Sequence, residues 1–312
     1  MGVYLVDKPL HETSFDVVAA ARRALGTRRV GHTGTLDPLA SGLLVVAAGE
    51  STKLVQFLTG VDKEYLAFVA LGAATATLDA EGPVVEERGT ALPDAATLEG
   101  ALSQLRGEQM QVPPAHSAVQ VGGVRAYAAA REGKPLDLPA RPVAVHELTL
   151  LATLPSMAGA PGLRFAPARE GWRLAEEGRG FGFPDRLGEH SVLVLRARVS
   201  SGTYIRSLAR DVGLRLGVPA HLAGLVRTRV GAFDLAAAVP PSGLAAAEPL
   251  GDLEALALPT IHLDPVQARD ARDGKRLPSD ALGFVALAHG GRLLAVAEGD
   301  GASLRVRRGW SQ

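Results

Sequence analysis

The chain contains no cysteine among its 312 residues. It therefore has no disulfide framework and no thiolate ligands for zinc, which fits a reducing compartment. No apolar run reaches the roughly 18 residues that a membrane-spanning helix needs. The first ten residues, MGVYLVDKPL, contain both acidic and basic side chains. We therefore expect neither a membrane span nor a secretion signal, and a cytoplasmic location.

Net charge is also absent, because 33 basic residues balance 33 acidic ones. This balance argues against a protein that coats nucleic acid through bulk electrostatics, although an enzyme acting on one RNA needs only a local basic face. Lysine is scarce, with 5 Lys against 28 Arg. The planar guanidinium suits phosphate contacts and stacking. A codon bias toward Arg, Ala and Gly explains the same composition equally well.

The most informative segment is residues 31–44, GHTGTLDPLASGLL, which places one carboxylate, Asp37, on a turn punctuated by glycines. Pro38 disfavours the helical region for Asp37, and the glycines allow close approach of a ligand. A phosphate-binding loop of the GxxxxGK[ST] type is excluded, because no lysine follows Gly34. His32 and Asp37 without a third ligand make a poor metal site, so we expect no metal.

Hydrophobic periodicity predicts mixed strands and helices along the chain. The predicted elements are strands at 2–6, 43–48, 64–71 and 192–199, and helices at 14–25 with Ser14 as the cap, at 97–106, and at 205–216 with Ser200 or Ser201 as the cap. Residues 154–190 lose periodicity and predict an insertion, partly disordered, in place of a core element. Near the C-terminus, alternating runs at 285–288 and 292–297 predict a hairpin, with a third strand at 304–306.

The segment around Asp37 resembles the catalytic motif of bacterial tRNA pseudouridine synthases of the TruB type, with Asp37 at the position of the catalytic aspartate. Other pseudouridine synthase families typically carry HRLD there, whereas this chain has Gly34-Thr35-Leu36-Asp37. Further strings match the same family: VDKPLHETS, DKEYLAF, VSSGTYIRSLARDVG and LVRTRVGAF. The resemblance covers residues 2–150 and 192–235, with a weaker match at the C-terminus.

The resemblance implies a role for several side chains. Arg206 matches the arginine that pairs with the catalytic aspartate, and Tyr65 matches a tyrosine that stacks on the target base. Taken alone, a helical arginine is usually a solvated charge, and a strand tyrosine is usually core packing. The remaining substrate-binding residues implied by the resemblance are His32, Tyr204, Lys8, Leu225, Gly34 and Thr35, with Lys8 and Pro9 also expected to support the catalytic loop.

The chain departs from the family pattern at three positions. Its segment VPPAHSAVQVGGVRAYAAAREG resembles PPxYSAxKxxGxxAYxxAR, but His116 replaces a tyrosine and Gln120 a lysine, while Tyr127 and Arg131 are kept. Val226 replaces an arginine in the string that resembles LRRTRVGxF. We expect these changes to affect RNA affinity more than chemistry.

The resemblance also implies a fold and a substrate. We expect an α+β protein, with a mixed, mostly antiparallel sheet and flanking helices in a catalytic domain at 1–250, and a small β-rich PUA-like RNA-binding domain at 258–312. The implied reaction converts uridine 55 in the T-arm loop of tRNA to pseudouridine after base flipping, in a monomer without metal, organic cofactor or guide RNA.

Several alternatives stay open at this point. The aspartate can attack the sugar, add to the base or remove a ribose proton. The chain can also be a tRNA-folding chaperone or RNA-binding module, or a guide-dependent pseudouridine synthase, which shares the catalytic motif.

Overall fold

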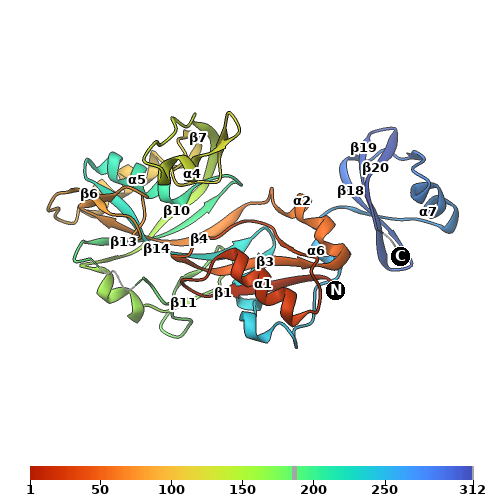
Figure 1. Cartoon of the computed structure of the whole chain (residues 1–312), viewed down its shortest axis with the longest axis horizontal. Helices are drawn as coiled ribbons and strands as arrows, with labels where there is room; N and C mark the ends of the chain where they lie inside the picture. The colour runs from red at the N-terminus through yellow and green to blue at the C-terminus, as the bar shows by residue number, and fades with distance from the viewer. Residues whose placement is uncertain (185–187, 311–312) are drawn as a thin grey trace.

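The computed structural model describes residues 1–184 and 188–310, and it contains a large lobe with a nine-stranded sheet and a smaller C-terminal lobe (Figure 1). The strands of the large sheet are β1 (Val3–Lys8), β2 (Val30–His32), β3 (Ala40–Ala48), β4 (Lys63–Leu71), β7 (Gly107–Gln111), β10 (Arg141–Leu154), β13 (Val192–Val199), β14 (Ala220–Val230) and β15 (Phe233–Asp234). Short strand pairs lie outside it: β5 (Ala73–Thr75) with β6 (Val84–Glu87), β8 (Gln120–Val121) with β9 (Val124–Arg125), and β11 (Phe165–Ala166) with β12 (Arg173–Leu174).

The helices are short and flank the sheets. They are α1 (Ser14–Ala24), α2 (Val55–Leu58), α3 (Ala95–Ser103), α4 (Ala126–Arg131), α5 (Ile205–Leu216), α6 (Asp252–Ala255) and α7 (Pro265–Arg272), with 3₁₀ turns η1 (Gly49–Leu54), η2 (Met157–Gly162), η3 (Leu235–Ala237) and η4 (Pro241–Gly243). Within the described residues, no helix is both long enough and apolar enough to span a membrane.

The main path of the large sheet runs β1-β3-β14-β4-β13-β10-β7, and all of its pairings are antiparallel except β14 with β3. The mixed, mostly antiparallel sheet is therefore confirmed. The parallel pair matters for the site, because it sets Leu225 opposite Ala40, which closely follows the loop residue Asp37. Chain segments that are far apart in sequence thus meet at one place in the sheet.

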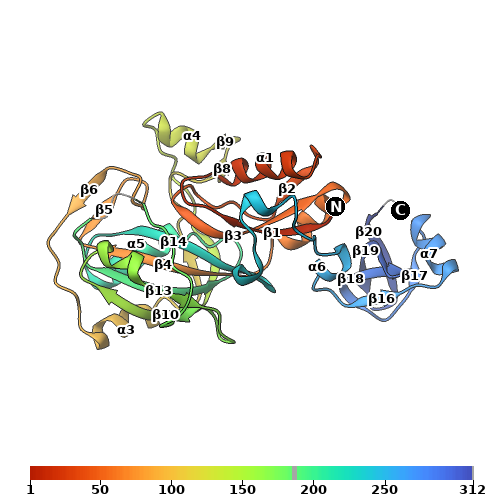
Figure 2. The ribbon, with the colours of Figure 1, turned by 90° about the horizontal axis from the view of Figure 1, so that it is seen from below.

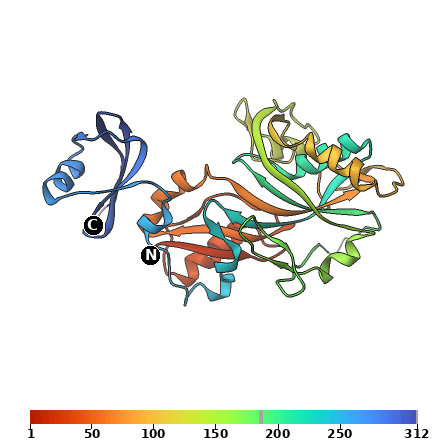
Figure 3. The same ribbon diagram turned by 180° about the vertical axis from the view of Figure 1, so that it is seen from behind.

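Strand β4 lies near the middle of this sheet and is buried on both faces, as its continuous apolar sequence predicts. Tyr65, Ala67 and Val69 pack with α3 and α5 on one face. Leu66, Phe68 and Ala70 on the other face belong to a second apolar cluster. Figure 3 shows the two helices on one side of the strands.

That second face is covered by the segment predicted to be an insertion outside the core. Its side chains Phe165, Trp172 and Phe181 are buried in the same cluster as Phe68, and Trp172 is only 2% exposed. The Nε1 of Trp172 donates to Asp234 at 3.0 Å. The prediction of a segment outside the core is therefore wrong for these residues; residues 185–187 of the predicted insertion lie outside the described part of the chain.

Two predicted helix caps are also wrong. Thr13, not Ser14, caps α1, and it forms a capping box with Asp16. The Ser14 hydroxyl instead bonds the backbone of the loop that carries Asp37. Helix α5 begins after Tyr204 without a side-chain cap, and the Ser200 hydroxyl accepts from Ala144 N–H at 2.8 Å. In each case a serine near the helix start joins two separate segments.

The C-terminal lobe has a curled five-stranded sheet in the order β16-β18-β19-β20-β17, formed by β16 (Thr260–His262), β17 (Leu277–Pro278), β18 (Leu282–His289), β19 (Arg292–Asp300) and β20 (Ser303–Gly309). The predicted hairpin is confirmed, and its two turn glycines, Gly290 and Gly291, both have positive φ. Figure 2 shows this lobe at one end of the molecule. The sheet and its helix fit the expected PUA-like domain; the boundaries 1–250 and 258–312 stay a prediction, and residues 311–312 are not among those described.

Candidate active site

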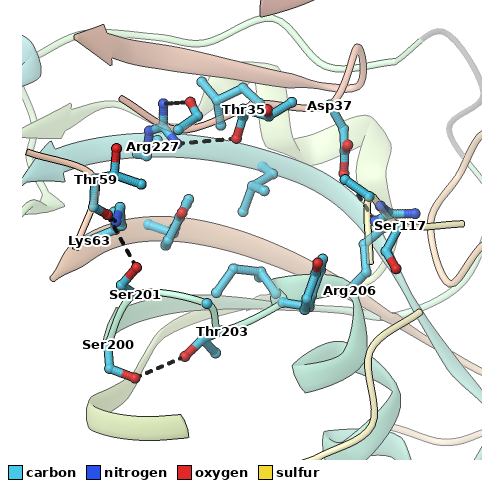
Figure 4. A pocket seen from close by; sticks show the side chains of 18 of the residues that line it. Thr35, Asp37, Thr59, Lys63, Ser117, Ser200, Ser201, Thr203, Arg206 and Arg227 are labelled. Atoms are coloured by element: carbon cyan, nitrogen blue, oxygen red, sulfur yellow. Dashed lines mark hydrogen bonds and ion pairs between the residues drawn. The ribbon is translucent and has the colours of Figure 1, made fainter. Parts of the chain in front are cut away.

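A pocket of about 500 Å³ opens over the middle of the large sheet, a size typical of ligand sites (Figure 4). Most of its wall comes from the loop before β3, strands β4 and β14, the turn before α5 with the start of that helix, and the 116–118 segment. Seven of the nine predicted site residues line it: Gly34, Thr35, Asp37, Tyr65, Tyr204, Arg206 and Leu225.

Asp37 lies on the loop between β2 and β3, and hydrogen bonds fix this loop on both sides of it. The Ser14 hydroxyl accepts from Leu36 N–H at 2.8 Å and donates to Leu36 C=O at 3.1 Å. The Asp37 carbonyl accepts from Ala40 N–H at 3.0 Å. These bonds fix the backbone on both sides of Asp37 and so set the position from which its side chain enters the pocket.

Arg227, buried on β14, supports the same loop from below. Its guanidinium donates to the carbonyl oxygens of Leu43 at 2.8 Å, Gly34 at 3.0 Å and Thr35 at 3.3 Å. Gly42 permits the close approach of the Arg227 backbone to β3, since it has φ +99° and a Cβ there would lie 2.4 Å from the Arg227 carbonyl oxygen. Arg227 belongs to one of the matching strings, but the sequence alone assigned it no role.

The Asp37 carboxylate forms an ion pair with Arg206 of α5, whose Nε lies 3.0 Å from Asp37 Oδ2. Nη1 of Arg206 lies 3.3 Å from Oδ2 of Asp79, and the side chain of Asp79 is buried. The guanidinium also donates to the carbonyl oxygens of Thr77 at 3.2 Å and His116 at 2.9 Å. Four groups thus fix one guanidinium, which in turn orients Asp37.

Asp79 was not predicted from the sequence, because an acid in a loop is usually a solvated surface group. Its side chain accepts from the Thr77 hydroxyl at 2.6 Å and from Glu81 N–H at 3.1 Å. The backbone around it bridges to Leu222 of β14. These bonds hold the second carboxylate against Arg206.

Burial and neighbouring charges oppose one another at Asp37. Desolvation raises the pKa of Asp37, the Arg206 guanidinium lowers it, and the Asp79 carboxylate raises it again. Its side chain keeps 38% of its surface exposed, and Asp37 lines the pocket. The ion pair with Arg206 therefore favours the charged form of an acid whose surroundings disfavour charge.

The two tyrosines reach the pocket from different elements. Tyr65 lies on β4 and is mostly buried, and Tyr204 lies immediately before α5. The side chain of Gln111 forms two hydrogen bonds with the backbone of Tyr204: its Oε1 accepts from the Tyr204 N–H at 2.8 Å, and its Nε2 donates to the Tyr204 C=O at 3.2 Å. Aromatic rings and a charged acid thus share one cavity.

Lys8 and His32 do not line the pocket. Lys8 is fully buried, and its ammonium donates to the carbonyls of Pro9 and Glu12. Burial lowers the pKa of Lys8 to about 8. The side chain therefore supports the chain beside the loop, and its assignment to substrate binding stays a prediction. His32 accepts from Gly34 N–H at 3.3 Å, and burial lowers its pKa.

Lys63 is a pocket residue that was not selected from the sequence. It lies with Thr59 and Ser201 at the end of the cavity away from Asp37 (Figure 4). Its ammonium donates to the carbonyls of Thr59 and Val61 at 2.7 Å each, and burial lowers the pKa of Lys63 to about 8. It belongs to the string DKEYLAF, which also contains Tyr65.

Metal binding finds no support in the described parts of the chain, where no group of three or more His, Cys, Asp or Glu side chains could hold an ion. The two carboxylates at the site, Asp37 and Asp79, both face Arg206. The arrangement can instead present a charged oxygen to a flat ligand that lies against an aromatic ring.

Comparison with known proteins agrees with this geometry. The family described as TruB family pseudouridylate synthase (N terminal domain) matches residues 22–159. Proteins named tRNA pseudouridine synthase B from Deinococcus deserti and Thermus thermophilus are each 53% identical to this chain. The first alignment covers 100% of both chains, and the second covers 99% of this chain and 98% of the relative.

Solved structures show a shared fold. A Cbf5-Nop10-Gar1 complex matches with a TM-score of 0.66 and 23% identity, over 99% of this chain and 84% of the other. An H/ACA RNP bound to a substrate RNA containing 2'-deoxyuridine matches with a TM-score of 0.65 and 22% identity, over 100% of this chain and 85% of the other. The fold prediction is confirmed. Because its identity to named relatives extends over the whole sequence, the chain belongs to the TruB family of pseudouridine synthases and is an isomerase.

Proposed function

We propose that this chain converts uridine to pseudouridine in tRNA, at position 55 of the T-arm loop, with Asp37 as the catalytic group. The names of its relatives support tRNA as the substrate. The observation that carries the proposal is the Asp37 carboxylate, held 3.0 Å from the Arg206 guanidinium in a cavity that Tyr65 also lines. The position in the T-arm rests on the motif resemblance.

The reaction breaks the C1'–N1 bond of uridine, turns the uracil and joins it through C5, without oxidation or hydrolysis. A base inside a folded RNA loop must leave its stack to reach the Asp37 carboxylate in the pocket. In this proposal Tyr65 stacks on the extruded uracil, an interaction that contributes roughly 1–3 kcal/mol per base. Asp37 then acts on the nucleoside, and Arg206 keeps it charged and oriented.

The cavity has a further task, because the detached uracil must stay bound until it is rejoined. A site closed on the substrate excludes water and retains the free base. Arginines on β20, including Arg305 and Arg308, supply positive charge on the C-terminal lobe for the RNA arm. We propose a monomer that acts on tRNA in the cytoplasm without a guide RNA.

The test is incubation of the purified chain with a bare T-arm hairpin RNA, followed by detection of pseudouridine. Conversion of the hairpin without any added guide RNA supports the proposal. A chain that binds the hairpin without converting it is an RNA-binding module or chaperone. Conversion that requires an added guide RNA identifies a guide-dependent synthase.

A further inference from the structure

The pocket contains polar atoms that nothing in the described chain satisfies. Ser117 lines the cavity and is only 4% exposed, yet its hydroxyl is buried and has no hydrogen-bond partner among the described residues. Thr33 and His116 also line the pocket, and the Thr33 hydroxyl and Nδ1 of His116 are likewise buried without a hydrogen-bond partner among the described residues. An unpaired buried hydroxyl costs stability, and such groups are rare unless a ligand supplies the partner.

Ser117 is held close to the reacting acid. Figure 4 shows it beside the Asp37–Arg206 pair. Arg206 Nη2 donates to the carbonyl of the preceding residue, His116, at 2.9 Å. The carbonyl of Ser117 accepts from Tyr127 N–H at 3.0 Å. The guanidinium that orients Asp37 therefore also fixes the backbone that carries this hydroxyl.

We infer that the Ser117 hydroxyl binds the uracil of the target nucleotide by donating a hydrogen bond to one of its ring carbonyls. This inference rests on the proposed function and adds a residue that recognises the base. Turning the detached uracil about its N3–C6 axis exchanges N1 with C5, and it also exchanges the C2 and C4 carbonyls. A donor facing a carbonyl before the turn therefore faces a carbonyl after it.

A hydroxyl suits this step better than an ammonium or an amide. It rotates about its C–O bond, and it can donate to a carbonyl or accept from N3–H while the ring turns. Ser117 thus holds the free base in both orientations without charge. Asp37 cannot take this role, since an ionised carboxylate only accepts hydrogen bonds.

The test compares wild type, Ser117→Ala and the control Ser103→Ala, whose hydroxyl bonds its own helix α3 on the surface. Single-turnover conversion is measured on T-arm hairpins carrying uridine, 2-thiouridine or 4-thiouridine at the target. Loss of one neutral hydrogen bond should slow Ser117→Ala about three- to tenfold on uridine, with hairpin affinity unchanged within about twofold. Ser103→Ala should match wild type.

The thio substrates separate contact from indirect effects, because sulfur is a weak acceptor. Wild type should convert at least one of the two thio substrates more slowly than it converts uridine. Ser117→Ala should convert that same thio substrate at the rate at which it converts uridine. The inference is overturned if Ser117→Ala converts uridine at the wild-type rate, or if both thio effects persist at full size in the variant. Failure of wild type itself to convert uridine would instead refute the proposed function.

Discussion

Replacement of Arg206 by lysine should separate the charge of this residue from its geometry. The guanidinium uses three nitrogens to contact Asp37, Asp79 and the carbonyls of Thr77 and His116. A lysine keeps the positive charge but offers one nitrogen, so it cannot reach all four groups. The variant therefore keeps a cation in the site and loses the fixed direction of the carboxylate.

The magnitude follows from the hydrogen bonds that a lysine cannot make. A hydrogen bond to a charged group contributes about 1.5–3 kcal/mol, so the absence of one or two of them should cost about 2–4 kcal/mol. If that cost falls on the orientation of Asp37, conversion slows by about 30- to 1,000-fold. The pKa of Asp37 should also rise, because its strongest charge-stabilising neighbour is weakened. In the proposed mechanism the ionised acid is the active form, so as the pH falls the variant should lose activity at a higher pH than wild type.

The assay is single-turnover conversion of tRNA across the acidic to neutral range, together with thermal unfolding of both proteins. A variant with a rate within about twofold of wild type would refute the role of the planar fork. An unchanged acid limb would show that a lysine ammonium holds Asp37 in its charged form as well as the guanidinium does, which contradicts the predicted shift.

Two further predictions concern the support of the site. Trp172→Ala should lower the free energy of unfolding by about 3–5 kcal/mol, measured by denaturant titration, because it empties a buried site in the main cluster; a loss below about 1 kcal/mol would mean that the segment lies outside the core after all. Gly42→Ala should destabilise by more than about 2 kcal/mol, since its Cβ would collide with the Arg227 backbone. The control Gly100→Ala on α3, where a Cβ meets nothing within 4 Å, should be neutral or stabilising, and equal effects of the two changes would contradict the role of Gly42.

Local sequence patterns predicted the elements whose environment is uniform. The run at β4 is apolar on both faces because helices cover one side and aromatic residues the other. The segment containing Phe165 and Trp172 was misjudged, since isolated aromatics among Gly, Pro and Arg show no periodicity. Such residues reach the core through irregular backbone, which only the tertiary structure defines.

The candidate site was also predicted only where local sequence motifs mark its residues. Motifs predicted Asp37, Tyr65 and Arg206 as site residues, and all three line one pocket. Asp79 could not be found from sequence, because its contact with Arg206 joins two distant parts of the chain and no local pattern marks it. Sequence also does not reveal that the Lys8 ammonium donates to two backbone carbonyls.

The central claim is that the Asp37 carboxylate acts on one uridine of tRNA. The most direct test maps the modified nucleotide by mass spectrometry in tRNA incubated with wild type or with Asp37→Asn, with tRNA affinity measured in parallel. We predict pseudouridine at position 55 with wild type and none with the variant, while affinity stays within about tenfold. Ample pseudouridine formed by Asp37→Asn, or modification at a different nucleotide, would contradict the account.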